Sequence, residues 1–161
     1  MSLNVLGLDP GPEQTAFVWF DGTRPGLNGL VKNEEMLALL AQAQTNGANI
    51  WCEDIASYGM AVGASVFSTC IWIGRYWQRV VDHASFHRVF RRDVKLHLCH
   101  SPRAKDGNVR VALIDRIGPQ GTKKQPGPTY GIRSHVWAAL AVAVYGHDQL
   151  SGRTTIGRSP A

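Results

Sequence analysis

The sequence predicts one α/β domain built on a mixed five-stranded sheet whose first strands are antiparallel. Three short β-rich runs separated by turn signals come before residue 32, which is typical of antiparallel strands. After them, two more apolar runs alternate with segments of helical spacing. A length of 161 residues, with 44% hydrophobic and 18% charged side chains, suits a single domain with its own core.

The expected strands are short apolar runs that stop at turn residues. The run 3–8 ends at Asp-Pro-Gly-Pro, and the run 15–20 is followed by Asp-Gly, a hairpin signal. The run 27–31 supplies the third strand. The runs 48–52 and 86–90 are the fourth and fifth strands, so the sheet mixes local hairpins with strands reached through helices.

Apolar residues at helical spacing predict the helices. In the first, Asn33 is expected to be the N-cap, Met36 and Leu40 lie on one face, and Gly47 follows the end. The helix 64–81 is apolar nearly all the way round, so one face can meet the sheet while the other needs a second partner. The remaining helices are expected over 93–99, 106–117 and from 134 to about 145.

The chain is expected to form a domain over 1–148 and a disordered tail over 149–161, because the tail is polar and lacks periodicity. The segment 118–131 is rich in Gly, Pro and Lys and is expected to be a mobile loop. No stretch approaches the ~20 apolar residues of a membrane span, and the first residues do not look like a signal peptide. We therefore expect a cytoplasmic protein, of a bacterium or a phage-infected cell, without membrane association.

The charge balance favours a phosphate-bearing partner. Seventeen Lys and Arg residues outnumber twelve Asp and Glu residues, which gives a net charge of +5. Basic residues gather between positions 88 and 116 and again at Lys123 and Lys124. Since the acidic residues are few, any clustering of them needs a chemical reason.

Two carboxylates stand where predicted strands end: Asp9 after the first strand and Glu53 after the fourth. Strand ends that lie side by side would bring these side chains together. Carboxylates forced that close repel each other unless a cation lies between them. Hard oxygen ligands suit Mg²⁺ or Mn²⁺, which can promote phosphodiester hydrolysis. The simpler interpretation is a turn Asp before Pro-Gly and a solvated Glu at a strand terminus.

Four segments taken together resemble the RuvC-type Holliday junction resolvases, of the ribonuclease H-like superfamily. They are LGLDPG, WCEDIASYGM, VKLHLCHSPRAKD and SHVWAALAVAV, which follow the family's order between residues 6 and 144. The sequence is most similar in style to the shorter, phage-encoded branch. The resemblance implies a ribonuclease H-like fold and a metal-dependent endonuclease that cuts four-way DNA junctions with paired, symmetric nicks.

The resemblance also implies which residues bind the metal. Asp9 and Glu53 correspond to metal-binding acids, and His135 lies where the family has its third ligand, Asp or His. The simpler alternative for His135 is a packed or capping residue at a helix start. The implied cofactor is Mg²⁺ or Mn²⁺.

One position departs from the family pattern. Family members often carry another Asp one helical turn after the third ligand, and this chain has Ala138 there. Either three ligands with water suffice, or a carboxylate from elsewhere contributes. Among carboxylates outside the family pattern, Asp115 is the first candidate for the additional metal ligand and Asp106 is the second.

Lysines and an aromatic residue are expected to contact branched DNA. The resemblance places Lys95 and Lys105 near the scissile phosphate and Tyr58 where the family stacks an aromatic on an unpaired base. Because a junction has two equivalent strands to cut, a homodimer is expected, with the helix 64–81 as its interface. The full set of expected DNA-binding residues is Lys95, Lys105, Tyr58, Arg103, Lys123 and Lys124.

Three other functions remain open from the sequence. A nuclease of the same fold could cut flaps or replication forks with identical metal chemistry. A junction-binding module without catalysis is compatible with Ala138. A sugar kinase or actin-like phosphotransferase also ends its first strand in Asp-x-Gly, but it needs two copies of the fold. With 161 residues the chain offers one copy, so no nucleotide cofactor is expected.

Overall fold

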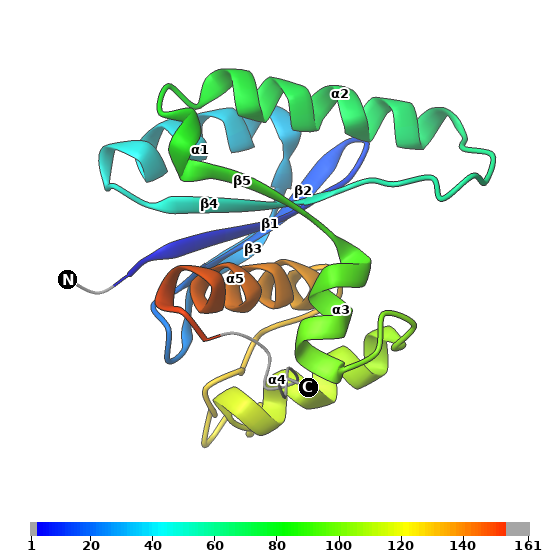
Figure 1. Cartoon of the computed structure of the whole chain (residues 1–161). Helices are drawn as coiled ribbons and strands as arrows, with labels where there is room; N and C mark the ends of the chain where they lie inside the picture. The colour runs from blue at the N-terminus through cyan, green and yellow to red at the C-terminus, as the bar shows by residue number, and fades with distance from the viewer. Residues whose placement is uncertain (1–2, 154–161) are drawn as a thin grey trace.

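A computed structural model describes residues 3–153, and a five-stranded sheet lies at its centre (Figure 1). The strand order is β3-β2-β1-β4-β5. β1 pairs with β2, and β2 with β3, in antiparallel fashion, whereas β1–β4 and β4–β5 are parallel. The predicted mixed sheet with an antiparallel start is confirmed. The strands are β1 (Val5–Pro10), β2 (Gln14–Phe20), β3 (Pro25–Lys32), β4 (Asn49–Asp54) and β5 (Phe86–Phe90).

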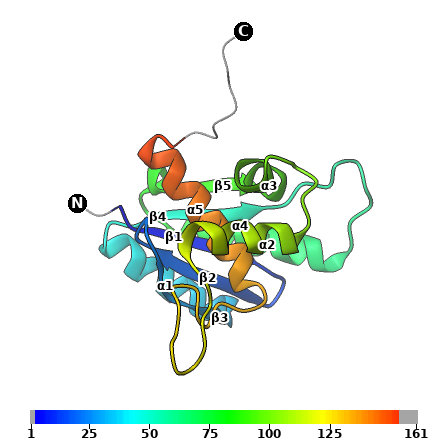
Figure 2. The same ribbon diagram turned by 90° about the horizontal axis from the view of Figure 1, so that it is seen from below.

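Helices cover both faces of the sheet (Figures 1 and 2). α1 (Asn33–Thr45) and α2 (Ala64–Arg79) lie on one face, and a 3₁₀ turn (His83–Ser85) precedes β5. α5 (Val136–Ser151) lies on the other face, beside α3 (Arg91–Cys99) and α4 (Asp106–Ile117). α5 runs past residue 148, where the domain was expected to end, and the tail from 154 to 161 lies outside the described residues. Within 3–153 no helix is long and apolar enough to cross a membrane.

The alternation of side chains along β1 and β4 decides which way the strand-end acids face. Leu8 is buried in the core between the sheet and the α1–α2 layer, so the next residue, Asp9, faces the α5 layer. In β4, Trp51 is buried in the core on the α5 side, and Glu53, two residues further on, faces the same way. Both acids therefore point toward the start of α5.

Glycine and alanine let α5 lie directly on the sheet. A Cβ on Gly7 would collide with the Ala139 carbonyl oxygen and would come within 2.7 Å of Ala143, so a larger residue has no room there. Farther along the helix, Gly146 leaves space for the Trp51 ring in the same way. The apolar, alanine-rich sequence of α5 is thus explained by close packing on β1 and β4.

Asn33 is not the N-cap that the sequence predicted. It is the first residue of α1 and is fully buried. Its side-chain oxygen accepts hydrogen bonds from the Thr15 hydroxyl (2.7 Å) and the Tyr76 hydroxyl (2.9 Å), and its amide donates to the Gly11 carbonyl (3.0 Å). The side chain therefore holds the turn after β1 in place, because these buried polar groups satisfy one another.

A partly buried ion cluster joins α3, α4 and α5 near their carboxyl-terminal ends. Asp148, which is 1% exposed, accepts two hydrogen bonds of 2.6 Å from Arg116, and its Oδ2 lies 2.7 Å from His97 Nε2. Burial alone would raise the pKa of Asp148, but the hydrogen bonds from Arg116 and His97 lower it to about 2. We call these three residues the helix clamp.

Candidate active site

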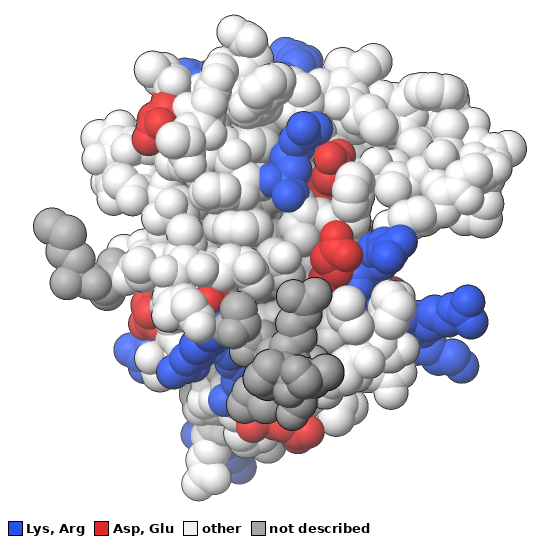
Figure 3. Space-filling view, viewed as in Figure 1, with Lys and Arg blue, Asp and Glu red and all other residues white. Residues whose placement is uncertain are grey.

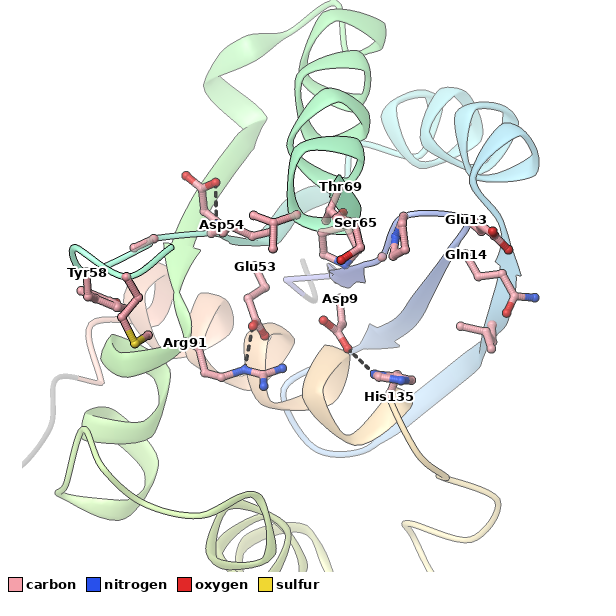
Figure 4. A pocket seen from close by; sticks show the side chains of 18 residues that line it. Asp9, Glu13, Gln14, Glu53, Asp54, Tyr58, Ser65, Thr69, Arg91 and His135 are labelled. Atoms are coloured by element: carbon pink, nitrogen blue, oxygen red, sulfur yellow. Dashed lines mark hydrogen bonds and ion pairs between the residues drawn. The ribbon is translucent and has the colours of Figure 1, made fainter. Parts of the chain in front are cut away.

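Asp9, Glu53 and His135 come together at the carboxyl ends of β1 and β4 (Figure 4). The parallel register of β1 and β4 pairs Leu8 with Cys52, so the residues that follow, Asp9 and Glu53, are neighbours. His135 immediately precedes α5, and its Nδ1 lies 3.2 Å from Asp9 Oδ2. All three side chains line one cavity of about 690 Å³, which we call the acidic pocket.

The carboxyl groups of Asp9 and Glu53, which line the acidic pocket together with Glu13 and Asp54, both have raised pKa values. Burial raises the pKa of Asp9, while the positive charge of Arg91 and the proximity of His135 lower it in part. Burial, and then the negative charge of Asp9, raise the pKa of Glu53 to about 7. Two buried carboxylates that disfavour each other's charge form a site that a bound cation would stabilise.

Arg91 makes a shorter polar contact in the pocket than the one between His135 and Asp9. It is the first residue of α3, directly after β5, and its Nε donates to Glu53 Oε1 at 2.7 Å. The sequence had indicated only that Arg91 belongs to a basic region. The same rule that selected Asp9 and Glu53, a polar side chain at a strand end, would have selected Arg91 if it had been applied to β5.

The donor set fits one divalent cation. Within residues 3–153, no three side chains of His, Cys, Asp and Glu already surround a common metal position. Glu53 turns to Arg91, whereas Asp9 contacts His135. Two carboxylates and an imidazole lining one pocket are nevertheless donors that suit Mg²⁺ or Mn²⁺.

The structure does not bring Asp115 to this site, so its role as an outside metal ligand is not supported. Leu113 is the buried residue of that turn of α4, and Asp115, two positions later, is exposed on another face of the helix. Asp106, ranked behind it, is the nearer acid. It lines a second cavity next to Ala138 and pairs with Lys95 at 3.0 Å.

The expected DNA-binding residues divide into two groups. Tyr58 lines the acidic pocket, is 57% exposed and has a left-handed backbone (φ 50°), and Lys95 lines the second cavity. Arg103 and Lys105 are exposed in the connection between α3 and α4. Blue side chains gather at the edge of the molecule beside this connection in Figure 3. Tyr58 and Lys95 therefore line the two cavities, whereas Arg103 and Lys105 line neither and lie in the connection that leads to Asp106.

Lys123 and Lys124 lie apart from the pocket. The segment 118–131, expected to be a mobile loop, is closed by a β-bridge between Gly121 and Pro126. The two lysines occupy the turn beyond this bridge and are exposed. Figure 2 shows the segment, in yellow, projecting from the domain. It forms a projecting arm, none of whose residues lines either cavity.

Comparison with known proteins identifies the fold. No protein-family model matches the chain, and no curated protein sequence does either. The structure of Thermus thermophilus RuvC matches with a TM-score of 0.66 and 18% identity over 94% of this chain and 98% of that one. The T. thermophilus RuvC structure in complex with Holliday junction substrate matches with a TM-score of 0.68 and 17% identity over 95% and 98%. The chain therefore has the ribonuclease H-like fold of RuvC.

Proposed function

We propose that this protein is a Holliday junction resolvase, a metal-dependent endonuclease that cuts four-way DNA junctions by phosphodiester hydrolysis. The observation that carries the proposal is the convergence of Asp9, Glu53 and His135 at the strand ends of a RuvC fold. The match covers nearly all of both chains, and one matching structure is a complex with Holliday junction substrate. The four sequence segments that resemble the resolvases include the same three residues.

In this proposal Asp9, Glu53 and His135 would hold Mg²⁺ or Mn²⁺. When bound, such an ion would polarise a phosphate oxygen and lower the pKa of an attacking water molecule. Burial of Asp9 (8% exposed) removes competing water and fixes the carboxylate, and its contact with His135 orients the imidazole. Lys95, in the adjoining cavity, offers a positive charge to a phosphate oxygen.

DNA would approach across the open side of the acidic pocket. Arg103 and Lys105 would contact the backbone, and Lys123 and Lys124 on the projecting arm would reach a more distant phosphate. Tyr58 lies in the loop 55–63, which contains no charged residue. Its exposed ring would stack on an unpaired base at the junction centre.

We also propose a homodimer formed through α2. This helix exposes the large apolar side chains of Phe67 (59%), Ile71 (64%) and Trp77 (47%), and Phe67 and Ile71 lie one helical turn apart on the same face. A two-fold interface there would present two acidic pockets to the two equivalent strands of a junction. The predicted dimer would have twice the mass of the 17.6 kDa chain.

The test compares synthetic four-way junctions, flaps and linear duplexes with and without Mg²⁺ or Mn²⁺. We expect metal-dependent, paired nicks in the junction and little cutting of the duplex. Asp9→Asn and Glu53→Gln should abolish cleavage and leave junction binding nearly intact, because each amide keeps the shape and loses the charge. Preferential cutting of flaps would favour the flap or fork nuclease. Tight junction binding without cleavage under either metal would identify a binding module instead.

A further inference from the structure

A second cavity of about 270 Å³ adjoins the acidic pocket, and the two share Glu53, Arg91 and His135. The second cavity is also lined by Lys95 and Ala138. Glu53 therefore lies between two cavities that are lined by different charged side chains. Asp9 lines only the first cavity and Lys95 lines only the second, so we call the second the basic pocket.

Both carboxylates that line the basic pocket already face a cation. Arg91 Nε donates to Glu53 Oε1 at 2.7 Å, and Lys95 Nζ lies 3.0 Å from Asp106 Oδ1. The Lys95 side chain is only 17% exposed, so its charge is poorly screened by water. The methyl group of Ala138 offers no ligand to a metal here.

The balance of charge leads to the same distinction between the two pockets. In the basic pocket, Glu53 and Asp106, when ionised, bring two negative charges, and Arg91 and Lys95 bring two positive charges, so the sum is zero. The acidic pocket is lined by the four carboxylates of Asp9, Glu13, Glu53 and Asp54, and Arg91 is its cationic side chain besides His135. The net negative charge of the acidic pocket attracts a divalent cation, whereas a cation in the basic pocket would add two uncompensated positive charges to a partly buried site.

We infer that this site takes one divalent cation, in the acidic pocket, and that Arg91 with Lys95 fills the electrostatic role of a second. The inference rests on the proposed nuclease function. Arg91 keeps Glu53 oriented and, with Lys95, leaves N–H donors facing the basic pocket. A guanidinium group matches the oxygens of a phosphate better than any other side chain does. The basic pocket therefore receives a phosphate group of the DNA backbone.

The test counts Mn²⁺ ions bound per chain without DNA, by the loss of the free Mn²⁺ signal in electron paramagnetic resonance. The wild type should bind one ion. The double variant Arg91→Ala with Ala138→Asp, which removes a charge and restores a carboxylate, should bind two. Arg91→Lys keeps the charge and should bind one, as should Arg92→Ala, a control at the exposed neighbouring position.

The outcomes separate this inference from the proposed function. Two outcomes would overturn the role of Arg91 and leave the nuclease proposal standing. In the first, the wild type binds two Mn²⁺ ions. In the second, the double variant binds only one ion and Arg91→Lys also binds one. No Mn²⁺ on any variant would reject the metal-dependent function itself. As a second readout, the wild-type cleavage rate should rise with the first power of Mn²⁺ concentration, and a second-power dependence would also overturn the inference.

Discussion

Replacing Asp148 by Asn should destabilise the protein without touching the acidic pocket. In the folded protein the pKa of Asp148 is about 2, nearly two pH units below its ordinary 3.8, and each unit corresponds to about 1.4 kcal/mol. The ionised carboxylate therefore contributes between about 2 and 3 kcal/mol at neutral pH. The variant also leaves Arg116 and His97 facing an uncharged amide. Because the Arg116 side chain is 28% exposed, this adds less than the about 3–5 kcal/mol that removal of one partner from a fully buried pair costs. We expect a loss of about 3 kcal/mol.

Urea denaturation at pH 7 measures this loss, and the melting temperature should fall by roughly 10 °C for a chain of this size. Asp115→Asn is the matched control, since that acid is exposed on α4 and should change stability by less than about 0.5 kcal/mol. Because the folded pKa is depressed, the contribution of Asp148 is complete above about pH 4 and disappears as the pH falls toward 2. The stability of Asp148→Asn should therefore depend less on pH in that window. A variant within 1 kcal/mol of the wild type would refute the reasoning.

Three further predictions concern the proposed nuclease. His135→Asp should retain cleavage with better use of Mg²⁺, whereas His135→Ala should be severely impaired; near wild-type cutting by the Ala variant would make His135 structural. Replacing Lys123 and Lys124 by Ala should reduce the slope of log affinity against log salt by up to about 2 while sparing cleavage at saturation, and an unchanged slope would place the arm away from DNA. Ile71→Asp should convert a dimer into a monomer in sedimentation velocity at micromolar concentration, and a wild-type monomer that still makes paired cuts would contradict the dimer.

The strand-end acids could be predicted because their positions depend on local sequence. An apolar run shows where β1 or β4 stops, and the period of two shows which face the next residue takes. The positions of polar residues on the helices were harder to predict from the sequence. Asp115 and Asp106 both belong to α4, and only the packing of that helix against α3 and α5 decides which acid approaches Ala138.

The contact partners of Arg91 and Asn33 could not be predicted for a related reason. The roles of both depend on partners far away in sequence: Arg91 contacts Glu53, 38 residues earlier, and Asn33 contacts Tyr76, 43 residues later. For Asn33 the local signal, a good N-cap before an acidic first turn, pointed to a different role. A buried polar side chain can replace a capping interaction whenever the fold brings it enough partners, and no short segment reveals that.

The backbone contact between Gly7 and α5 determines how the site could change its chemistry. No flexible side chain lies between β1 and the Ala139 carbonyl, so the separation of the two main chains is set by their own atoms. Asp9 and His135 extend from these two main chains, at the end of β1 and the start of α5. The side chain at position 135 can therefore be exchanged while its Cα stays in place. In the proposed metal site, a single substitution at position 135 would therefore exchange a nitrogen donor for an oxygen donor, and with it the metal preference, without repacking of the core.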